Sequence, residues 1–167
     1  MRKCLFLYLL IVMLCKCSCD DDHWSIDIYN NSEKTIFTNN GWHYPDTTFA
    51  VNYVFDPFYN DKKDTANKTQ WAKPFQKCIT YVGRHSTWES NFKYENDTVM
   101  IFIFDGDVIG NVDWEIVKKD YLILQRYDLS LQDLQKLNWK VDYPPTEAMK
   151  EMKMYPSYQG EQNDDTD

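Results

Sequence analysis

The chain has 167 residues and a formal net charge of −8, which suits one domain around one hydrophobic core. A surface this acidic repels nucleic-acid phosphates, so we expect no nucleic-acid partner. Of the five cysteines only Cys78 lies beyond residue 19, which argues against a small fold held together by disulfides.

The first 22 residues have the order of an export signal. A basic start, Met1-Arg2-Lys3, precedes an apolar run over residues 4–14, and the acidic triplet Asp20, Asp21 and Asp22 follows Cys19. The apolar run is shorter than the roughly 20 residues that a membrane-spanning helix needs. We therefore predict a signal peptide over 1–18, a lipidated acidic tether over 19–23, one globular domain over 24–156 and a disordered acidic tail over 157–167.

The cysteine at the end of this leader resembles the lipidation site of bacterial lipoproteins, in which the acylated Cys becomes the mature N-terminus. Cys19 follows a small residue, Ser18, and is the predicted anchor; Cys17, with Leu14 at the usual aliphatic position, is the second choice. The acidic triplet resembles the export tag of Bacteroidetes surface lipoproteins. The resemblance implies an acyl-anchored protein on the cell surface of the outer membrane. The alternatives are its periplasmic face, or an ordinary cleaved signal followed by a solvated linker.

Alternating apolar and polar residues predict most of the strands. We expect a hairpin of Trp24–Tyr29 and Lys34–Thr38 around the turn residues 30–33, followed by strands over Phe49–Phe55 and Lys77–Val82. Residues 99–104 are apolar at every position, which predicts a central strand covered on both faces.

Helix-capping signals recur in the last third of the chain. Asp113 is expected to cap a short helix, and Ser130 with Asp133 has the form of a capping box before Leu131, Leu134 and Leu137. Strands are expected over 121–127 and 139–143, and a last short helix after Thr146. These elements predict a mainly β, β-sandwich-like single domain with short helices. The alternative is an α+β fold with one mixed sheet and helices on one face.

Several short motifs in the last third resemble small Bacteroidetes lipoproteins of unknown function. They are Trp114-Glu115, Arg126-Tyr127-Asp128-Leu129-Ser130 and Leu137-Asn138-Trp139. The resemblance implies a periplasmic or surface lipoprotein. It carries no known activity, so it assigns no catalytic residue.

No constellation in the sequence predicts a cofactor. Asp105 and Asp107 form a weak candidate for a cation site, but isoleucines at positions five and twelve rule out an EF-hand loop, and a plain acidic turn is the alternative. The histidines do not have the spacing of a zinc site. His85 or a pair of carboxylates could serve a hydrolase, although the sequence lacks a nucleophile elbow.

The best candidates for ligand binding are aromatic residues in and near the loop 39–45. Trp42 and Tyr44, with Tyr59 and Trp71, combine rings with neighbouring amides and hydroxyls, a combination that suits sugars. The alternative is that these rings plug one end of the sandwich. Thr65, in the Asp64-Thr65-Ala66 stretch, is a candidate for O-glycosylation of the kind found in exported Bacteroidetes proteins, or lies in a merely solvated loop.

The sequence thus favours a monomeric, non-enzymatic binding or accessory module on a lipid anchor, with a glycan or an envelope protein as its partner. A structural envelope component is the second hypothesis. A hydrolase that uses carboxylates or His85 is the third.

Overall fold

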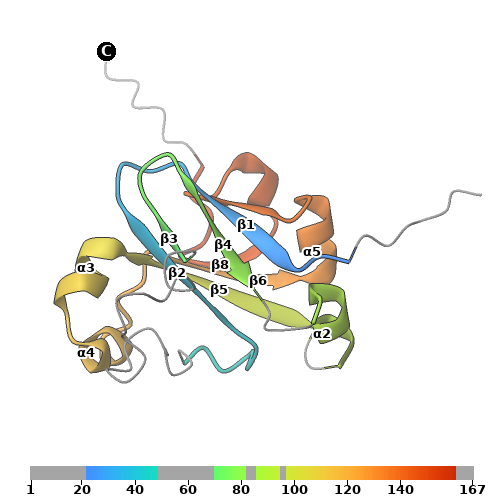
Figure 1. Ribbon diagram of the computed structural model, residues 1–167, viewed down its shortest axis with the longest axis horizontal. Coiled ribbons are helices and arrows are strands. Elements are labelled where there is room, and N and C mark those ends of the chain that lie inside the picture. Colours follow the sequence, from blue (N-terminus) through green and yellow to red (C-terminus); the bar gives the residue numbers. More distant parts are fainter. Residues whose placement is uncertain (1–21, 49–69, 82–85, 95–96, 161–167) are drawn as a thin grey trace, which may run out of the picture.

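The computed structural model describes residues 22–48, 70–81, 86–94 and 97–160. Their strands form two sheets (Figure 1). The smaller sheet has the order β4–β1–β7, with β1 (Ser25–Asn30) antiparallel to β4 (Lys77–Tyr81) and parallel to β7 (Lys140–Tyr143). The larger sheet is antiparallel, in the order β3–β2–β5–β6–β8. Its strands are β3 (Trp71–Ala72), β2 (Ile36–Gly41), β5 (Thr98–Asp105), β6 (Gln125–Ser130) and β8 (Lys153–Tyr155).

The main core lies between the two sheets. Ile26, Ile28 and Val141 of the smaller sheet belong to the same buried cluster as Ile101 and Leu129 of the larger one. Cys78 also lies in this cluster, and burial raises the pKa of its thiol to about 11, so the side chain acts as a small apolar group. The prediction of a mainly β, sandwich-like single domain is confirmed.

A second core covers the opposite face of the larger sheet. Along β5, Val99, Ile101 and Ile103 belong to the main core, while Met100, Phe102 and Phe104 belong to the second. Two short helices pack there, α3 (Gly106–Asn111) through Ile109 and α4 (Trp114–Lys119) through Val117. The prediction that this strand is covered on both faces is confirmed.

The predicted hairpin between the first two strands is wrong, because β1 and β2 belong to different sheets. Asn30 lies where the chain passes from the smaller sheet to the larger one. Its buried amide nitrogen lies 2.7 Å from the carbonyl oxygen of Lys34 and 3.1 Å from that of Ala72, and its Oδ1 accepts from the Ser32 hydroxyl at 2.7 Å. The residues do form a turn, but Ile36 and Phe37 are both buried, which places β2 inside the larger sheet beside β5.

The local capping signals are largely confirmed. Asp113 accepts from the Glu115 amide at 2.8 Å at the start of α4, and Ser130 and Asp133 form a capping box before α5 (Leu131–Lys136). Thr146 precedes a short 3-10 helix, Glu147–Met149, without a side-chain capping bond.

Several boundaries differ from prediction. The strand expected over 121–127 begins at Gln125, and the chain after residue 152 forms β8. The acidic turn after β5 is helix α3, and α2 (Trp88–Tyr94) was not anticipated. Within the described ranges no helix is long and apolar enough to span a membrane. The predictions for Cys17, Cys19, Asp20, Asp21, Phe49–Phe55, Tyr59, Thr65, His85 and residues 161–167 lie outside the described residues.

Candidate binding site

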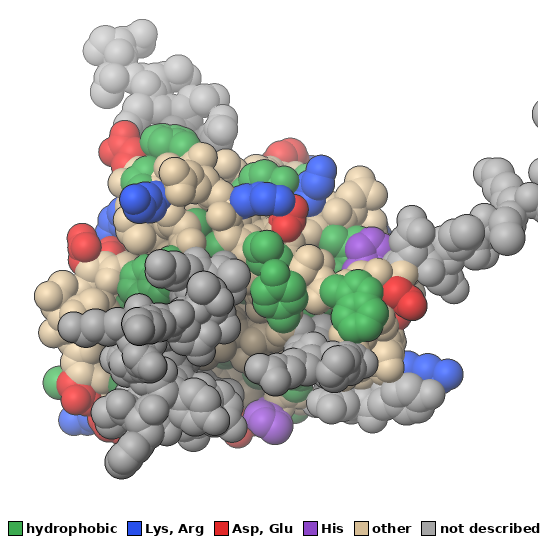
Figure 2. All heavy atoms as spheres, in the orientation of Figure 1, with side chains coloured by type: hydrophobic (Ala, Val, Ile, Leu, Met, Phe, Trp, Pro, Cys, Tyr) green, Lys and Arg blue, Asp and Glu red, His purple; other side chains and the backbone are tan. Residues whose placement is uncertain are grey.

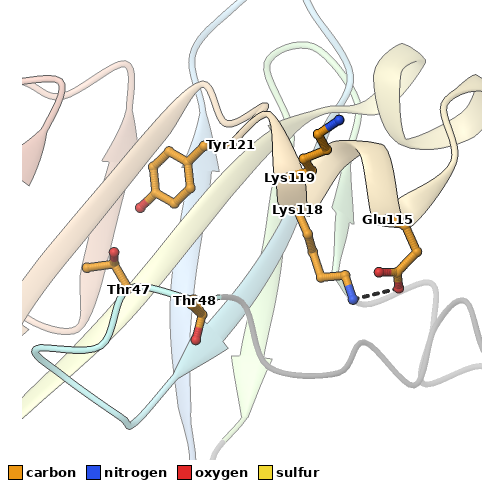
Figure 3. Close-up of a pocket in the computed structure, with 6 residues that line it drawn as sticks. All are labelled: Thr47, Thr48, Glu115, Lys118, Lys119 and Tyr121. Carbon is orange, nitrogen blue, oxygen red and sulfur yellow. Dashed lines mark ion pairs between the residues drawn. The ribbon is translucent and has the colours of Figure 1, made fainter.

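A pocket of about 390 Å³ opens beside α4 (Figure 3). Its lining residues bring hydroxyls, a carboxylate, an ammonium group and an aromatic ring, and they are Thr47, Thr48, Glu115, Lys118, Lys119 and Tyr121. The Lys119 ammonium points away from the other lining side chains in Figure 3. Small-molecule sites commonly have volumes of roughly 300–1,000 Å³. The pocket is therefore large enough for a small polar ligand.

Helix α4 supplies the charged side of the pocket. Asp113 caps the helix and buried Val117 fixes it to the second core, so the residues on its other side face solvent. Glu115 and Lys118, three residues apart, form an ion pair at 2.6 Å, drawn as the dashed line in Figure 3. The Glu115 side chain is nonetheless 77% exposed, so it keeps oxygen lone pairs available for a ligand.

Tyr121 supplies the aromatic wall. It follows α4 with a positive φ of 52°, which turns the chain sharply back toward β6. The guanidinium of Arg126 donates to its hydroxyl, and its ring meets that of Tyr155 edge-on, with 6.0 Å between the centroids. Contacts on both its hydroxyl and its ring hold Tyr121 in place.

A buried ion pair lies behind this wall. Arg126 and Asp128 pair in register with Phe102 and Met100, so they share the face of the sheet that carries the second core. The Asp128 side chain is fully buried, and that of Arg126 is 13% exposed. Burial acts to lower the pKa of Arg126, but the hydrogen bonds to Asp128 and Tyr121 outweigh it and raise the pKa above its usual value. The guanidinium therefore stays charged and keeps its hydrogen bond to the Tyr121 hydroxyl.

The opposite wall, residues 43–48, is attached to the edge strand β8. The ammonium of Lys153 donates to the Tyr44 hydroxyl and lies 4.7 Å from the centre of its ring. This hydrogen bond raises the pKa of Lys153. Asp46 accepts from the Thr48 amide at 3.0 Å, and that bond lowers the pKa of Asp46. These contacts hold Thr47 and Thr48 beside the pocket.

The aromatic residues expected to bind sugar do not form one platform in the described structure. Trp42 packs on the main core against Trp88 and Phe92, with ring centroids 5.3 Å apart in both cases. Tyr44 and Trp71 instead pack on the second core, across the larger sheet. Tyr44 thus supports the pocket indirectly, through its contact with Lys153.

The weak cation candidate is engaged in structural contacts. Asp105 pairs with Lys34 at 2.7 Å and caps α3 by accepting from the Asp107 amide at 3.0 Å. The hydrogen bond from Lys34 is the largest cause of the lowered pKa of Asp105. Within the described ranges, no group of three or more His, Cys, Asp or Glu side chains gathers in a way that could hold a metal ion.

Comparisons with protein-family models, with curated proteins and with solved structures find no match for the chain. The function is therefore inferred from the chemistry of the described residues and from the sequence.

Proposed function

We propose that this protein is a lipid-anchored binding module of the outer membrane and that the pocket beside α4 binds a carbohydrate. The observation that carries the binding proposal is the lining of that pocket. Hydroxyls, a carboxylate, an ammonium group and an aromatic ring line one volume of about 390 Å³. A sugar presents the matching surface, with many hydroxyls around its rim and apolar C–H groups on its ring faces.

Each side chain has a separate task in this proposal. Glu115 accepts hydrogen bonds from sugar hydroxyls, and Lys118 donates to sugar oxygens. Thr47 and Thr48 can do either. The Tyr121 ring offers an apolar face, and its hydroxyl is already oriented by Arg126, so little freedom is lost when the ligand binds.

The leader supports the anchored part of the proposal. The apolar run over 4–14 is too short to span a bilayer and ends near Cys17 and Cys19, with the acidic triplet close behind. Acylation of Cys19 would hold the module at the membrane surface. A single acyl chain binds membranes only marginally, and stable anchoring needs a second chain or signal.

The binding proposal is tested with the full, acylated protein on an array of neutral and acidic oligosaccharides. Glu115→Gln keeps the shape of the side chain but weakens its hydrogen bonds, and Glu151→Gln is the matched control on an exposed glutamate away from the pocket. A hydrogen bond to a charged group contributes about 1.5–3 kcal/mol and one between neutral groups about 0.5–1.5 kcal/mol. Glu115→Gln should therefore weaken binding roughly five- to tenfold, and Glu151→Gln should not. No binding to any sugar, or equal losses in the two variants, would contradict the proposal.

A further inference from the structure

The globular domain is fixed to its N-terminal tether at His23. The ring Nδ1 lies 2.7 Å from one oxygen of the Glu89 carboxylate, and the His23 amide donates to the other at 3.0 Å. The His23 carbonyl accepts from the Trp88 amide at 2.8 Å, and the ring stacks on Trp139 at 4.2 Å. These contacts join the start of the domain to helix α2 and to the entry of β7.

Two large aromatic side chains are exposed at the same end of the smaller sheet. Trp24 follows His23 directly and is 53% exposed, and Tyr81 is 49% exposed. Ser25, the next residue, pairs with Tyr81 across β1 and β4, so the register places both aromatic residues at this end. Figure 2 shows hydrophobic side chains, in green, over these strand ends, close to a histidine in purple.

The length of the tether limits how far the domain can lie from the membrane surface. Four peptide steps separate Cys19 from His23, which span roughly 14 Å when fully extended. The polar surface layer of one bilayer leaflet is roughly 5–8 Å thick. An acyl chain on Cys19 therefore holds His23 within roughly 6–9 Å of the outer edge of this layer, which keeps the Trp24 end of the domain within reach of the headgroups.

We propose that Trp24 and Tyr81 insert into the headgroup layer of the leaflet that holds the acyl anchor. Tryptophan and tyrosine prefer this layer because their rings are apolar while their N–H and O–H groups can still meet water. The acidic triplet disfavours anionic lipids, so the partner is a zwitterionic lipid surface. This inference rests on the anchor of the proposed function but not on sugar binding.

Insertion at this end orients the whole domain. The start of β1 and helices α2 and α5 lie at one end of the long axis, while α3 and α4 lie at the other (Figure 1). The pocket beside α4 therefore points away from the lipid surface.

The test places the mature, acylated protein in phosphatidylcholine and phosphatidylethanolamine vesicles whose chains carry bromine near the headgroup. Bromine quenches tryptophan fluorescence only at short range. Wild type should be quenched and Trp24→Phe should lose most of that quenching. Trp114→Phe, which removes a tryptophan at the α4 end, should keep it.

Mass spectrometry of the same sample separates the two proposals. An acylated protein that shows no quenching, or equal quenching in Trp24→Phe and wild type, would overturn the insertion while leaving the anchor intact. Protein that carries no acyl group would overturn both the anchor and the insertion. Neither result bears on sugar binding, which the oligosaccharide array tests separately.

Discussion

Arg126 and Asp128 form a two-pronged ion pair beneath the pocket, with Nε 2.8 Å from Oδ1 and Nη2 3.2 Å from Oδ2. The same guanidinium also donates to the Tyr121 hydroxyl. One buried pair thus connects the larger sheet with the aromatic wall of the pocket, and its loss should affect both stability and binding.

Asp128→Ala should be strongly destabilising, by about 3–5 kcal/mol, because it leaves a largely buried guanidinium without its partner. Urea unfolding followed by circular dichroism measures this cost. Asp107→Ala, at an exposed carboxylate, is the control and should change the free energy of unfolding by much less. Similar costs for the two variants would contradict the role given to the pair.

Replacing the Asn30 side chain should lower the stability of the fold, whether the amide is removed or changed to a carboxylate. Asn30→Ala removes the buried hydrogen bonds to the carbonyls of Lys34 and Ala72, at a cost of about 1–3 kcal/mol. Asn30→Asp should cost more, because a carboxylate oxygen would then face those carbonyl oxygens. The control is Gln76→Glu, the same amide-to-carboxylate change at an exposed side chain. Thermal unfolding in which Asn30→Asp matches wild type would show that the crossover between the sheets does not depend on this side chain.

The ion pair of Asp105 with Lys34 predicts a pH dependence. The pKa of Asp105 in the folded protein is lowered, first by the hydrogen bond from Lys34, so it lies below the unfolded value of about 3.9. Its stabilising contribution is therefore present at neutral pH and is lost as the pH falls below about 4. Asp105→Asn, which keeps a capping oxygen, should lower the melting temperature at pH 7, and the difference from wild type should shrink in acid. A constant difference across this range would refute the assignment.

The two candidate anchors make opposite predictions for their variants. Cys19→Ala should leave the protein unprocessed or soluble, whereas Cys17→Ala should still be acylated, since Ser18 makes Cys19 the better substrate. Mass spectrometry of the mature N-terminal peptide measures the outcome. An acyl group found on Cys17 would reverse the assignment.

Features set by neighbouring residues could be predicted from the sequence. The capping box joins Ser130 to Asp133, three positions on, and the cap joins Asp113 to Glu115, two positions on, so both depend on local geometry alone. The unbroken apolar run in β5 likewise indicated burial on both faces. By contrast, the turn chemistry of residues 30–33 predicts a reversal of the chain but not the sheet that the next strand joins.

The pocket depends on contacts that leave no local pattern. Tyr44 and Lys153, whose contact holds one wall, are 109 residues apart. Tyr121 forms the other wall because the chain takes a positive φ there, at a residue where an ordinary strand was expected. The sequence therefore favoured Trp42 and Tyr44 as ligand-binding residues. The structure instead places Thr47, Thr48 and helix α4 around the pocket.

The most direct test of the account is amide chemical-shift mapping by nuclear magnetic resonance with the tightest-binding oligosaccharide from the array. We predict the largest shifts at Thr47, Thr48 and residues 115–121, with little change at Trp24 and Tyr81. Shifts centred on the end that carries Trp24, or spread evenly over the domain, would contradict a sugar site beside α4.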